Sequence, residues 1–168
     1  MKLNLGCGNR RKEGFVHVDR FACEAADMLC DITCGLPFAN DSIEEVWLDN
    51  VIEHIADIPS LMREIVRVSK GGAKVTIITP HFTSAASWRD PSHVHHLSYF
   101  SLDHFQKKDV AHYIGGGLKV QSKKLSFGGG ITGIAARMLF FLSPKMYEEN
   151  FCFVFRASTL HVELTVEK

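Results

Sequence analysis

Short apolar runs alternate along the chain with polar segments that contain glycine. Four of these runs are rich in Val, Ile, Leu and Phe and stop at Gly, Asp or Pro, a pattern typical of buried strands. They are Lys2–Leu5 and residues 15–18, 45–48 and 74–79, and residues 28–31 form a weaker candidate. Between the last two strong runs, Ile58–Val68 has apolar residues at positions 58, 61, 62, 65, 66 and 68. This spacing predicts a helix with one buried face.

The order of these elements predicts a parallel sheet joined by crossover helices. Pro59 in the first turn of the helix, and Gly71 and Gly72 after it, mark the ends of the helix. In the last third of the chain, residues 118–125 and 160–166 alternate with a period of two and have no parallel-type crossover between them, which indicates an antiparallel edge. No repeat or linker interrupts the chain. We therefore expect one α/β domain over residues 1–168, mostly parallel with an antiparallel C-terminal edge.

The composition is that of a globular protein with no ionic bias. Of 168 residues, 46% are hydrophobic and 23% are charged, and the formal net charge is +0. We therefore expect no nucleic-acid partner. The longest apolar stretch, residues 131–142, is interrupted by Thr132, Gly133 and Arg137 and is too short to span a bilayer. We expect no stable membrane insertion, and we expect a cytoplasmic location because the N-terminus lacks the apolar core of a secretion signal.

The five cysteines form no C-x-x-C pair and are odd in number. This argues against a disulfide framework and favours small buried thiols in a reducing compartment. Cys30 and Cys34 are close enough in sequence for a metal pair, which is the alternative.

The first strand ends in a turn that can approach a ligand closely. Gly6 and Gly8 follow it directly, and glycine lets the backbone bend sharply with no Cβ in the way of a ligand. Asp19 closes the second strand, where a carboxylate can accept the hydroxyl hydrogens of an adenosine ribose. Together these features indicate a nucleotide site without identifying the nucleotide.

Two details argue against a dinucleotide at this turn. The position of the third glycine in the dinucleotide fingerprint is occupied by Arg11, and residues 9–14 are too few for the crossover helix whose N-terminus holds a pyrophosphate. S-adenosylmethionine has no phosphate and needs no such helix. The pattern therefore favours S-adenosylmethionine, with an enzyme of NAD or a nucleotide sugar on a similar sheet as an alternative.

Two motifs resemble a known family. Asp31, the LPF triplet at 36–38 and the segment from Ser42 to Val46 precede an E-H-I element at 53–55. This resembles the small class I, type 11-like methyltransferases, whose sheet is Rossmann-like. The opening L-N-L-G-C-G followed by G-F-V-H-V-D resembles a subgroup that lacks the first crossover helix, and the resemblance covers residues 2 to about 105. It implies that residues 9–14 form a loop and leave apolar sheet surface exposed there, which residues 131–142 or a second copy of the chain would cover.

The resemblance implies S-adenosylmethionine as the cofactor, bound at the carboxyl ends of the first strands. The implied contacts are Leu5, Gly6, Cys7, Gly8, Asp19, Arg20, Asp31, Ile32, Asp49, Asn50 and His54. Asp19 would hold the ribose, Asp31 and Ile32 the adenine, and Asp49 and Asn50 would lie beside the sulfonium. Asn4 replaces the acidic residue that many relatives carry in the first strand, and Asn50 stands where they often have His.

The sulfonium methyl is already activated, so its transfer requires an aligned nucleophile, exclusion of water and, for a hydroxyl acceptor, a base. Histidine is the natural base near neutral pH. His81, which follows the fifth strand, and His93 and His95, in a D-P-S-H segment that relatives also place over the pocket, are the predicted catalytic residues. Since alternate residues of a strand project to one side, His93, His95 and His96 could instead bind a metal, but we expect no metal.

The expected function is therefore S-adenosylmethionine-dependent methyl transfer to a small-molecule or glycan acceptor. The other hypothesis is a catalytically inactive cofactor-binding or assembly subunit, which Asn4, Asn50 and the missing helix favour. Residues 81–110 and 127–150 are expected to form a substrate-side loop and a lid-like insertion. Residues 131–142 are expected to serve as a lid, a homodimer interface or a membrane-surface helix.

Overall fold

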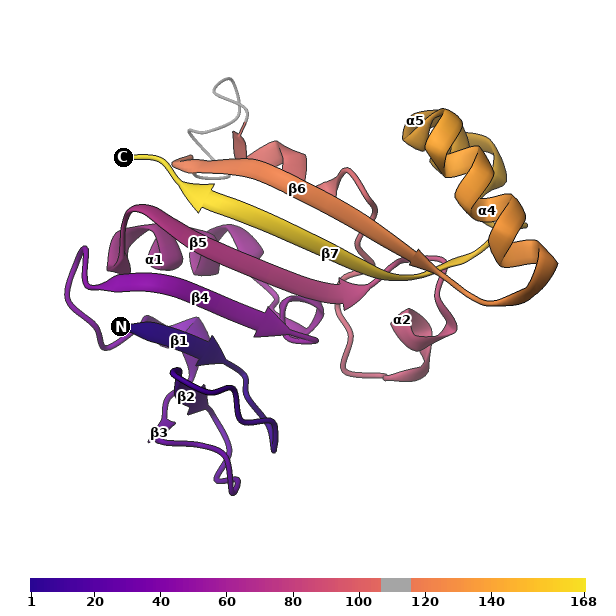
Figure 1. Ribbon diagram of the computed structural model, residues 1–168. Coiled ribbons are helices and arrows are strands. Elements are labelled where there is room, and N and C mark those ends of the chain that lie inside the picture. Colours follow the sequence, from indigo (N-terminus) through magenta and orange to yellow (C-terminus); the bar gives the residue numbers. More distant parts are fainter. Residues whose placement is uncertain (107–115) are drawn as a thin grey trace.

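Seven strands form one sheet in the order β3-β2-β1-β4-β5-β7-β6 (Figure 1). The computed structural model describes residues 1–106 and 116–168. The strands are β1 (Lys2–Leu5), β2 (Val16–Asp19), β3 (Met28–Leu29), β4 (Ile43–Asp49), β5 (Ser69–Pro80), β6 (Leu118–Phe127) and β7 (Ala157–Val166). Residues 107–110, part of the expected substrate-side loop, lie outside the described residues.

The mostly parallel sheet with an antiparallel C-terminal edge is confirmed, with one refinement. β1, β2, β3, β4 and β5 pair in parallel, and β7 pairs antiparallel with both β5 and β6. Because two reversals restore the direction, β6 runs parallel to β5 and β7 alone is reversed among the described strands. The last strand is thus inserted between β5 and the edge strand β6, and the two do not form a simple edge hairpin.

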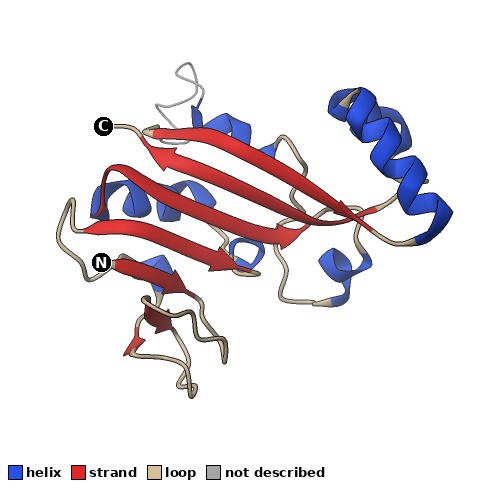
Figure 2. Cartoon of the chain, in the orientation of Figure 1, coloured by secondary structure: helices blue, strands red, loops and turns tan. Residues whose placement is uncertain are grey.

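In the described residues, the two longest helices have 11 and 13 residues. Figure 2 shows them beside the sheet. The described helices are α1 (Ile58–Val68), α2 (Ala85–Arg89), α4 (Gly130–Leu142), α5 (Pro144–Met146), three 3₁₀ helices (Ile32–Cys34, Ile52–His54, Ser101–Gln106) and a π-helical turn (Tyr147–Phe151). α1 has the predicted bounds and is capped by Asp57, whose side chain accepts the backbone N–H of Ser60. The glycine pair expected after α1 lies instead inside β5, which begins at Ser69. No helix in the described part of the chain has the length and apolar character that crossing a membrane requires.

One face of the sheet carries the main hydrophobic core. Alternate residues of the central strands, such as Leu48, Val75 and Val162, pack against the apolar stripe of α1 and against the Ser101–Gln106 helix. In α1 the stripe includes Leu61 and Ile65, which are fully or almost fully buried. Burial of this stripe against the sheet holds the crossover between β4 and β5 in place.

The opposite face of the sheet is polar, which corrects the expectation of an exposed apolar surface. Its charged residues pair across the strands: Lys2 with Glu45 at 2.8 Å and Lys74 with Glu163 at 2.7 Å. Glu163 also accepts a hydrogen bond from Ser122 on β6 at 3.2 Å. Parallel sheets are usually covered by helices on both sides. Here the ion pairs of Lys2 with Glu45 and of Lys74 with Glu163 lie on the solvent side, so these parts of the face do not need a covering helix.

Residues 9–14 form the predicted loop, and this loop folds over the polar face. The backbone N–H of Lys12 donates to His17 Nε2 at 2.7 Å, and Asn4 Nδ2 donates to the carbonyl of Arg10 at 3.1 Å. The Lys12 ammonium lies 3.7 Å from the centre of the Trp47 ring. The loop therefore covers the ends of β1, β2 and β4 by itself. α4 packs elsewhere, against Leu125 and Phe127 at the far end of β6 (Figure 1).

Arg67 ties the segment between β3 and β4 to α1. Its guanidinium donates to both carboxylate oxygens of Glu64 at 2.8 Å, to the carbonyls of Leu36 and Phe38 at 2.9 and 3.0 Å, and to Asn40 at 2.8 Å. These bonds, with the N–H of Leu36, lower the pKa of Glu64 to about 2. The resulting stabilisation is complete above the ordinary pKa of about 4.5 and is lost as the pH falls toward 2.

Replacing Arg67 with Lys should lower the free energy of unfolding by about 1–3 kcal/mol. The ammonium of Lys cannot reproduce the planar guanidinium, which donates hydrogen bonds to Glu64 and to two backbone carbonyls at the same time. Urea unfolding at neutral pH measures the loss. Arg11→Lys is the matched control, because Arg11 makes one exposed ion pair with Asp27 and should lose less than about 1 kcal/mol. Equal effects of the two substitutions would contradict the role assigned to Arg67.

Candidate functional site

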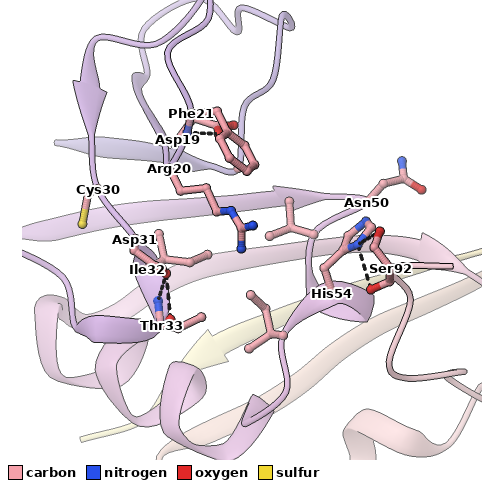
Figure 3. Close-up of a pocket in the computed structure, with 13 residues that line it drawn as sticks. Asp19, Arg20, Phe21, Cys30, Asp31, Ile32, Thr33, Asn50, His54 and Ser92 are labelled. Atoms are coloured by element: carbon pink, nitrogen blue, oxygen red, sulfur yellow. Dashed lines mark hydrogen bonds between the residues drawn. The ribbon is translucent and has the colours of Figure 1, made fainter. Parts of the chain in front are cut away.

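A cavity of about 570 Å³ opens at the carboxyl ends of the four parallel strands β1 to β4 (Figure 3). All the residues that line it except Ser92 lie at or after the ends of these strands, the position where ligands bind in open parallel sheets. The lining residues are Gly6, Asp19, Arg20, Phe21, Cys30, Asp31, Ile32, Thr33, Asn50, Val51, His54, Ile55 and Ser92. The cavity thus brings together seven of the predicted cofactor contacts: Gly6, Asp19, Arg20, Asp31, Ile32, Asn50 and His54.

The glycine turn is shaped by a neighbouring strand end. Gly6 has a φ of 65°, and a Cβ at this position would lie 2.5 Å from Val51 Cγ2. The absence of a side chain is therefore required by the close approach of the segment after β4, in addition to any ligand. Gly8 also has a positive φ, of 49°, but a Cβ there would meet nothing within 4 Å.

Asp19 joins the glycine turn to the turn after β2. Its Oδ2 accepts the backbone N–H of Gly8 at 2.8 Å and its Oδ1 accepts that of Phe21 at 2.9 Å. The residue is 9% exposed, at the rim of the cavity. Each carboxylate oxygen can accept a second hydrogen bond. Asp19 therefore fixes both turns and keeps acceptor capacity for a ligand.

The segment after β3 forms the opposite wall. Asp31 caps the Ile32–Cys34 helix by accepting the N–H and the hydroxyl of Thr33 at 3.0 and 2.7 Å. These hydrogen bonds lower the pKa of Asp31, so the group is a carboxylate at neutral pH. The guanidinium of Arg20 extends into the cavity between this wall and His54 (Figure 3).

Four predicted cofactor contacts do not line this cavity. Leu5 is fully buried in the core, and Gly8 acts through its bond to Asp19. Cys7 and Asp49 line a separate hollow of about 240 Å³ on the other side of the glycine turn. There Asp49 pairs with Arg10 at 3.0 Å and accepts a hydrogen bond from Asn50 at 2.7 Å.

Cys7 is a buried thiol at the edge of the glycine turn. Burial, together with Cys23, raises its pKa to about 11, so the group is uncharged near neutral pH.

A second cavity, of about 590 Å³, adjoins the first. Asn50 and His54 line both, and the second is completed by Pro80, Ala86, Arg89, Asp90, Pro91 and His93. The wall shared by the two cavities is therefore formed by the segment after β4 and by the loop of Asp90 to His93. The backbone N–H groups of Val94 and His95 both donate to the carbonyl of Glu53, at 2.9 and 3.1 Å, and hold this loop in place.

The structure separates the predicted catalytic histidines. His93 faces the second cavity. His81 is fully buried outside both cavities, with Nδ1 bonded to Thr83 at 2.8 Å and Nε2 to Glu148 at 3.1 Å. His95 Nε2 donates to the carbonyl of Ala56 at 3.1 Å. The contacts of His81 thus join the end of β5 to the π-helical turn, and the contact of His95 joins its loop to the segment before α1.

Glu53 is the residue at this wall that the sequence analysis did not single out. It is 1% exposed, and its Oε2 accepts the hydroxyl hydrogen of Thr79 at 3.0 Å. Its Oε1 has no hydrogen-bond partner among residues 1–106 and 116–168. Burial raises the pKa of this carboxyl. The signal in the sequence was its place beside His54 in the E-H-I element.

The chain also matches known proteins in sequence. Residues 8–77 match a family model described as a methyltransferase domain. The biotin biosynthesis bifunctional protein BioHC of Cellvibrio japonicus is 39% identical over 56 residues. Those residues are 33% of this chain and 11% of that relative, so the chain corresponds to a small part of the relative's length.

Solved structures share the fold at low sequence identity. An S-adenosylmethionine-dependent methyltransferase from Archaeoglobus fulgidus superposes with a TM-score of 0.64 at 17% identity, covering 98% of this chain and 85% of that one. The [4+2]-cyclase SpnF superposes with a TM-score of 0.60 at 12% identity, covering 99% and 75%. Residues 8–77 are thus similar to a methyltransferase domain, and the chain as a whole has the fold of structures described as S-adenosylmethionine-dependent methyltransferases.

Proposed function

We propose that the chain transfers a methyl group from S-adenosylmethionine to a hydroxyl group of a small-molecule or glycan acceptor. The observation that carries this proposal is the pair of adjoining cavities with a shared wall. One opens at the ends of β1 to β4 and contains Asp19 and Asp31, and the other lies beyond Asn50 and His54. Transfer between two molecules requires two sites that meet at the reacting atoms.

The first cavity fits S-adenosylmethionine better than a dinucleotide. Its volume is within the range of ordinary cofactor sites. No helix begins at the glycine turn, since residues 9–14 form a loop, so the usual site for a pyrophosphate is absent from this described segment. Asp19 has acceptor capacity for ribose hydroxyls, and Asp31 and Ile32 line the wall proposed for adenine. The backbone from Gly6 to Gly8 would face the methionine part.

The cofactor supplies an activated methyl group, and the residues of the chain position both molecules and exclude water. His54 and His93 are the imidazoles that reach the acceptor side, and we assign to them the interaction with the acceptor hydroxyl. His81, His95 and His96 have structural contacts instead, since the His96 ring is stacked on Trp88 and bonded to Ser87. Fewer histidines are therefore available to the acceptor than the His-rich segment suggests.

The fold by itself does not determine the reaction, since SpnF shares it and is a [4+2]-cyclase. A cofactor-binding protein without methyl transfer is therefore the second candidate, and Asn4 is the residue that favours it. In place of a carboxylate, Asn4 contributes an amide that holds the loop at Arg10.

A surface of apolar side chains on α4 supports a homodimer. Ile131, Ile134, Met138, Phe141 and Leu142 recur at helical spacing and are exposed, up to 89% for Phe141. An apolar stripe of this kind can pack against the same stripe of a second copy across a two-fold axis. We propose that α4 forms this contact.

Loss of Asp19 should weaken cofactor binding. Asp19→Ala should raise the dissociation constant of S-adenosylhomocysteine roughly 10- to 150-fold, about 1.5–3 kcal/mol, because charge-assisted hydrogen bonds are lost and the glycine turn is released. Calorimetric titration measures this. Glu44→Ala, at the opposite end of β4, removes an exposed ion pair with Lys70 and should leave affinity unchanged. If Asp19→Ala binds S-adenosylhomocysteine with unchanged affinity, Asp19 is not a cofactor contact.

The methyl-transfer proposal is tested with cofactor labelled in its methyl group and a pool of metabolites and glycans. We expect label in an acceptor, and we expect His93→Ala to lower turnover about 10²–10⁴-fold while S-adenosylhomocysteine still binds. His104→Ala, an exposed imidazole outside both cavities, is the control. Cofactor binding without label transfer to any acceptor would favour the second candidate.

The dimer proposal is tested by sedimentation equilibrium. The chain should sediment as a dimer, and a double Ile134→Glu, Phe141→Glu variant should sediment as a monomer with unchanged secondary structure, because buried unpaired carboxylates oppose association. Leu29→Glu places a charge on another exposed apolar residue, on β3, and should remain dimeric. A monomeric wild-type chain would rule out this interface.

A further inference from the structure

We propose that Glu53, His54 and His93 bind a divalent transition-metal ion in the wall between the two cavities. One ligand atom from each of these residues lies within 4.8 Å of the others. The assignment of these three residues as ligands is independent of the proposed function. What the ion does for the acceptor rests on that function.

The unpartnered oxygen of Glu53 is available to bind a cation. Glu53 is 1% exposed, and only its Oε2 has a partner, the hydroxyl of Thr79. His93 Nε2 lies 4.0 Å from Oε1, which is beyond hydrogen-bond distance. A buried carboxylate oxygen without a partner is costly, and such groups are rare in folded proteins. An ion between Oε1 and Nε2 would satisfy both.

His93 is held in the orientation of a metal ligand. Its Nδ1 lies 2.9 Å from the carbonyl of Ser87, and because a carbonyl only accepts, Nδ1 must carry the proton. The Nε2 of the neutral ring then has a free lone pair, on the side of Glu53. Metal-binding histidines commonly donate their other N–H to a backbone carbonyl in this way.

His54 is oriented by a chain of hydrogen bonds. The hydroxyl of Ser92 lies 2.5 Å from Asp90 Oδ1, so it donates there and accepts from His54 Nδ1 at 3.0 Å. This places the His54 proton on Nδ1 and leaves Nε2 available. The His54 and His93 rings lie 4.6 Å apart between centroids, at an angle of 74°.

The loop that carries His93 cannot move away freely, because two of its backbone N–H groups are bonded to the carbonyl of Glu53 itself. Asp90 Oδ2, 3.9 Å from His93 Nε2, is within reach as a fourth ligand. Tetrahedral ligands at 2.0–2.2 Å from zinc lie about 3.4 Å apart. His93 Nε2, which lies 4.0 Å from Glu53 Oε1 and 3.9 Å from Asp90 Oδ2, therefore needs to approach each oxygen by less than about 1 Å. Rotation of side chains supplies such a movement.

The donor set indicates the kind of ion and acceptor. Two imidazoles and a carboxylate suit zinc and neighbouring transition metals, with positions left open for a substrate. His54, Asp90 and His93 line the second cavity, so the open positions would face the acceptor. We therefore infer an acceptor with two neighbouring oxygens, such as the vicinal hydroxyls of a sugar, that both reach the ion.

A cation at this wall would favour loss of the acceptor's proton. The acceptor oxygen releases its proton to water and forms a bond to the methyl carbon. The sulfur–methyl bond breaks, and its electron pair remains on sulfur. No oxidant or reductant is required.

A second group of possible ligands, Cys7, Asp19 and Cys23, must be separated from this one in the test. Its atoms already have partners: both thiols donate to the carbonyl of Gly8, and both Asp19 oxygens accept backbone N–H groups. It therefore lacks the unpartnered buried atom that distinguishes the site at Glu53.

The test is titration of the chelator-treated full chain with Co²⁺, followed by calorimetry and by the visible spectrum. We expect one ion per chain without cobalt–thiolate absorption. Glu53→Gln, which keeps the shape and the contact with Thr79, and His93→Ala should each weaken binding by at least about 100-fold. His95→Ala, in the same loop, and Cys23→Ser should bind as the wild type does. Thermal unfolding and S-adenosylhomocysteine titration verify that each variant is folded.

Each outcome is decisive for the ion site. Absence of Co²⁺ binding, thiolate absorption that Cys23→Ser abolishes, or equal binding by Glu53→Gln and His93→Ala would overturn it. Because no acceptor is present, failure of methyl transfer does not affect this result. With a known acceptor, unchanged turnover after chelation and in Glu53→Gln would overturn the role of the ion while leaving the proposed transfer intact.

Discussion

The close approach of Gly6 to Val51 sets the geometry on which the site depends. The ends of β1 and β4 meet there with no room for a side chain on Gly6, since a Cβ would lie 2.5 Å from Val51. Asp19 then binds the same turn from the other side, through the N–H of Gly8. Three adjacent parallel strands are therefore held together at their carboxyl ends by this steric contact, by the Asp19 bond and by the backbone N–H groups of Gly6 and Cys7, which donate to the carbonyl of Val18. The cavity opens where these ends spread apart.

The sheet has two different faces, and this explains how a short chain supports the fold. One face is apolar and is covered by α1 and the Ser101–Gln106 helix. The other has lost its helices between β1 and β3, and it is stabilised by cross-strand ion pairs and by the loop that holds Asn4 and His17. Exposed ion pairs contribute little stability each, but they remove the need to bury an apolar face. The smaller helical layer leaves the carboxyl-end cavity accessible.

The segment after β4 links the first cavity to the second. The carbonyl of Glu53 holds the loop of His93, while its side chain lies beneath the two imidazoles. His54 lines both cavities. In the proposed reaction, His54 would therefore be within reach of both molecules. The wall is a candidate for the reacting part of the site because it lies between the two cavities, whatever the number of histidines nearby.

Much of the fold is determined by the sequence itself. Three local patterns predicted elements: the periodicity of Ile58–Val68, the apolar run before Gly6 and the short segment that leads to β2. Such patterns predict helices and strands because burial follows the period of the side chains. The glycine turn and the E-H-I motif, through the resemblance they carry, also indicated the cofactor class and seven of the residues that line the cavity at the ends of β1 to β4. These residues follow strands whose carboxyl ends must meet at one edge of a parallel sheet.

Only the tertiary structure decided which histidines face the cavities, that the uncovered face is polar and that Glu53 has an unpartnered oxygen. His81, His93 and His95 are alike in the sequence, but His81 is bonded to Glu148, which is 67 positions away. The insertion of β7 between β5 and β6 likewise follows from pairing between distant segments. Such contacts depend on how segments pack across the fold, and no local periodicity encodes them.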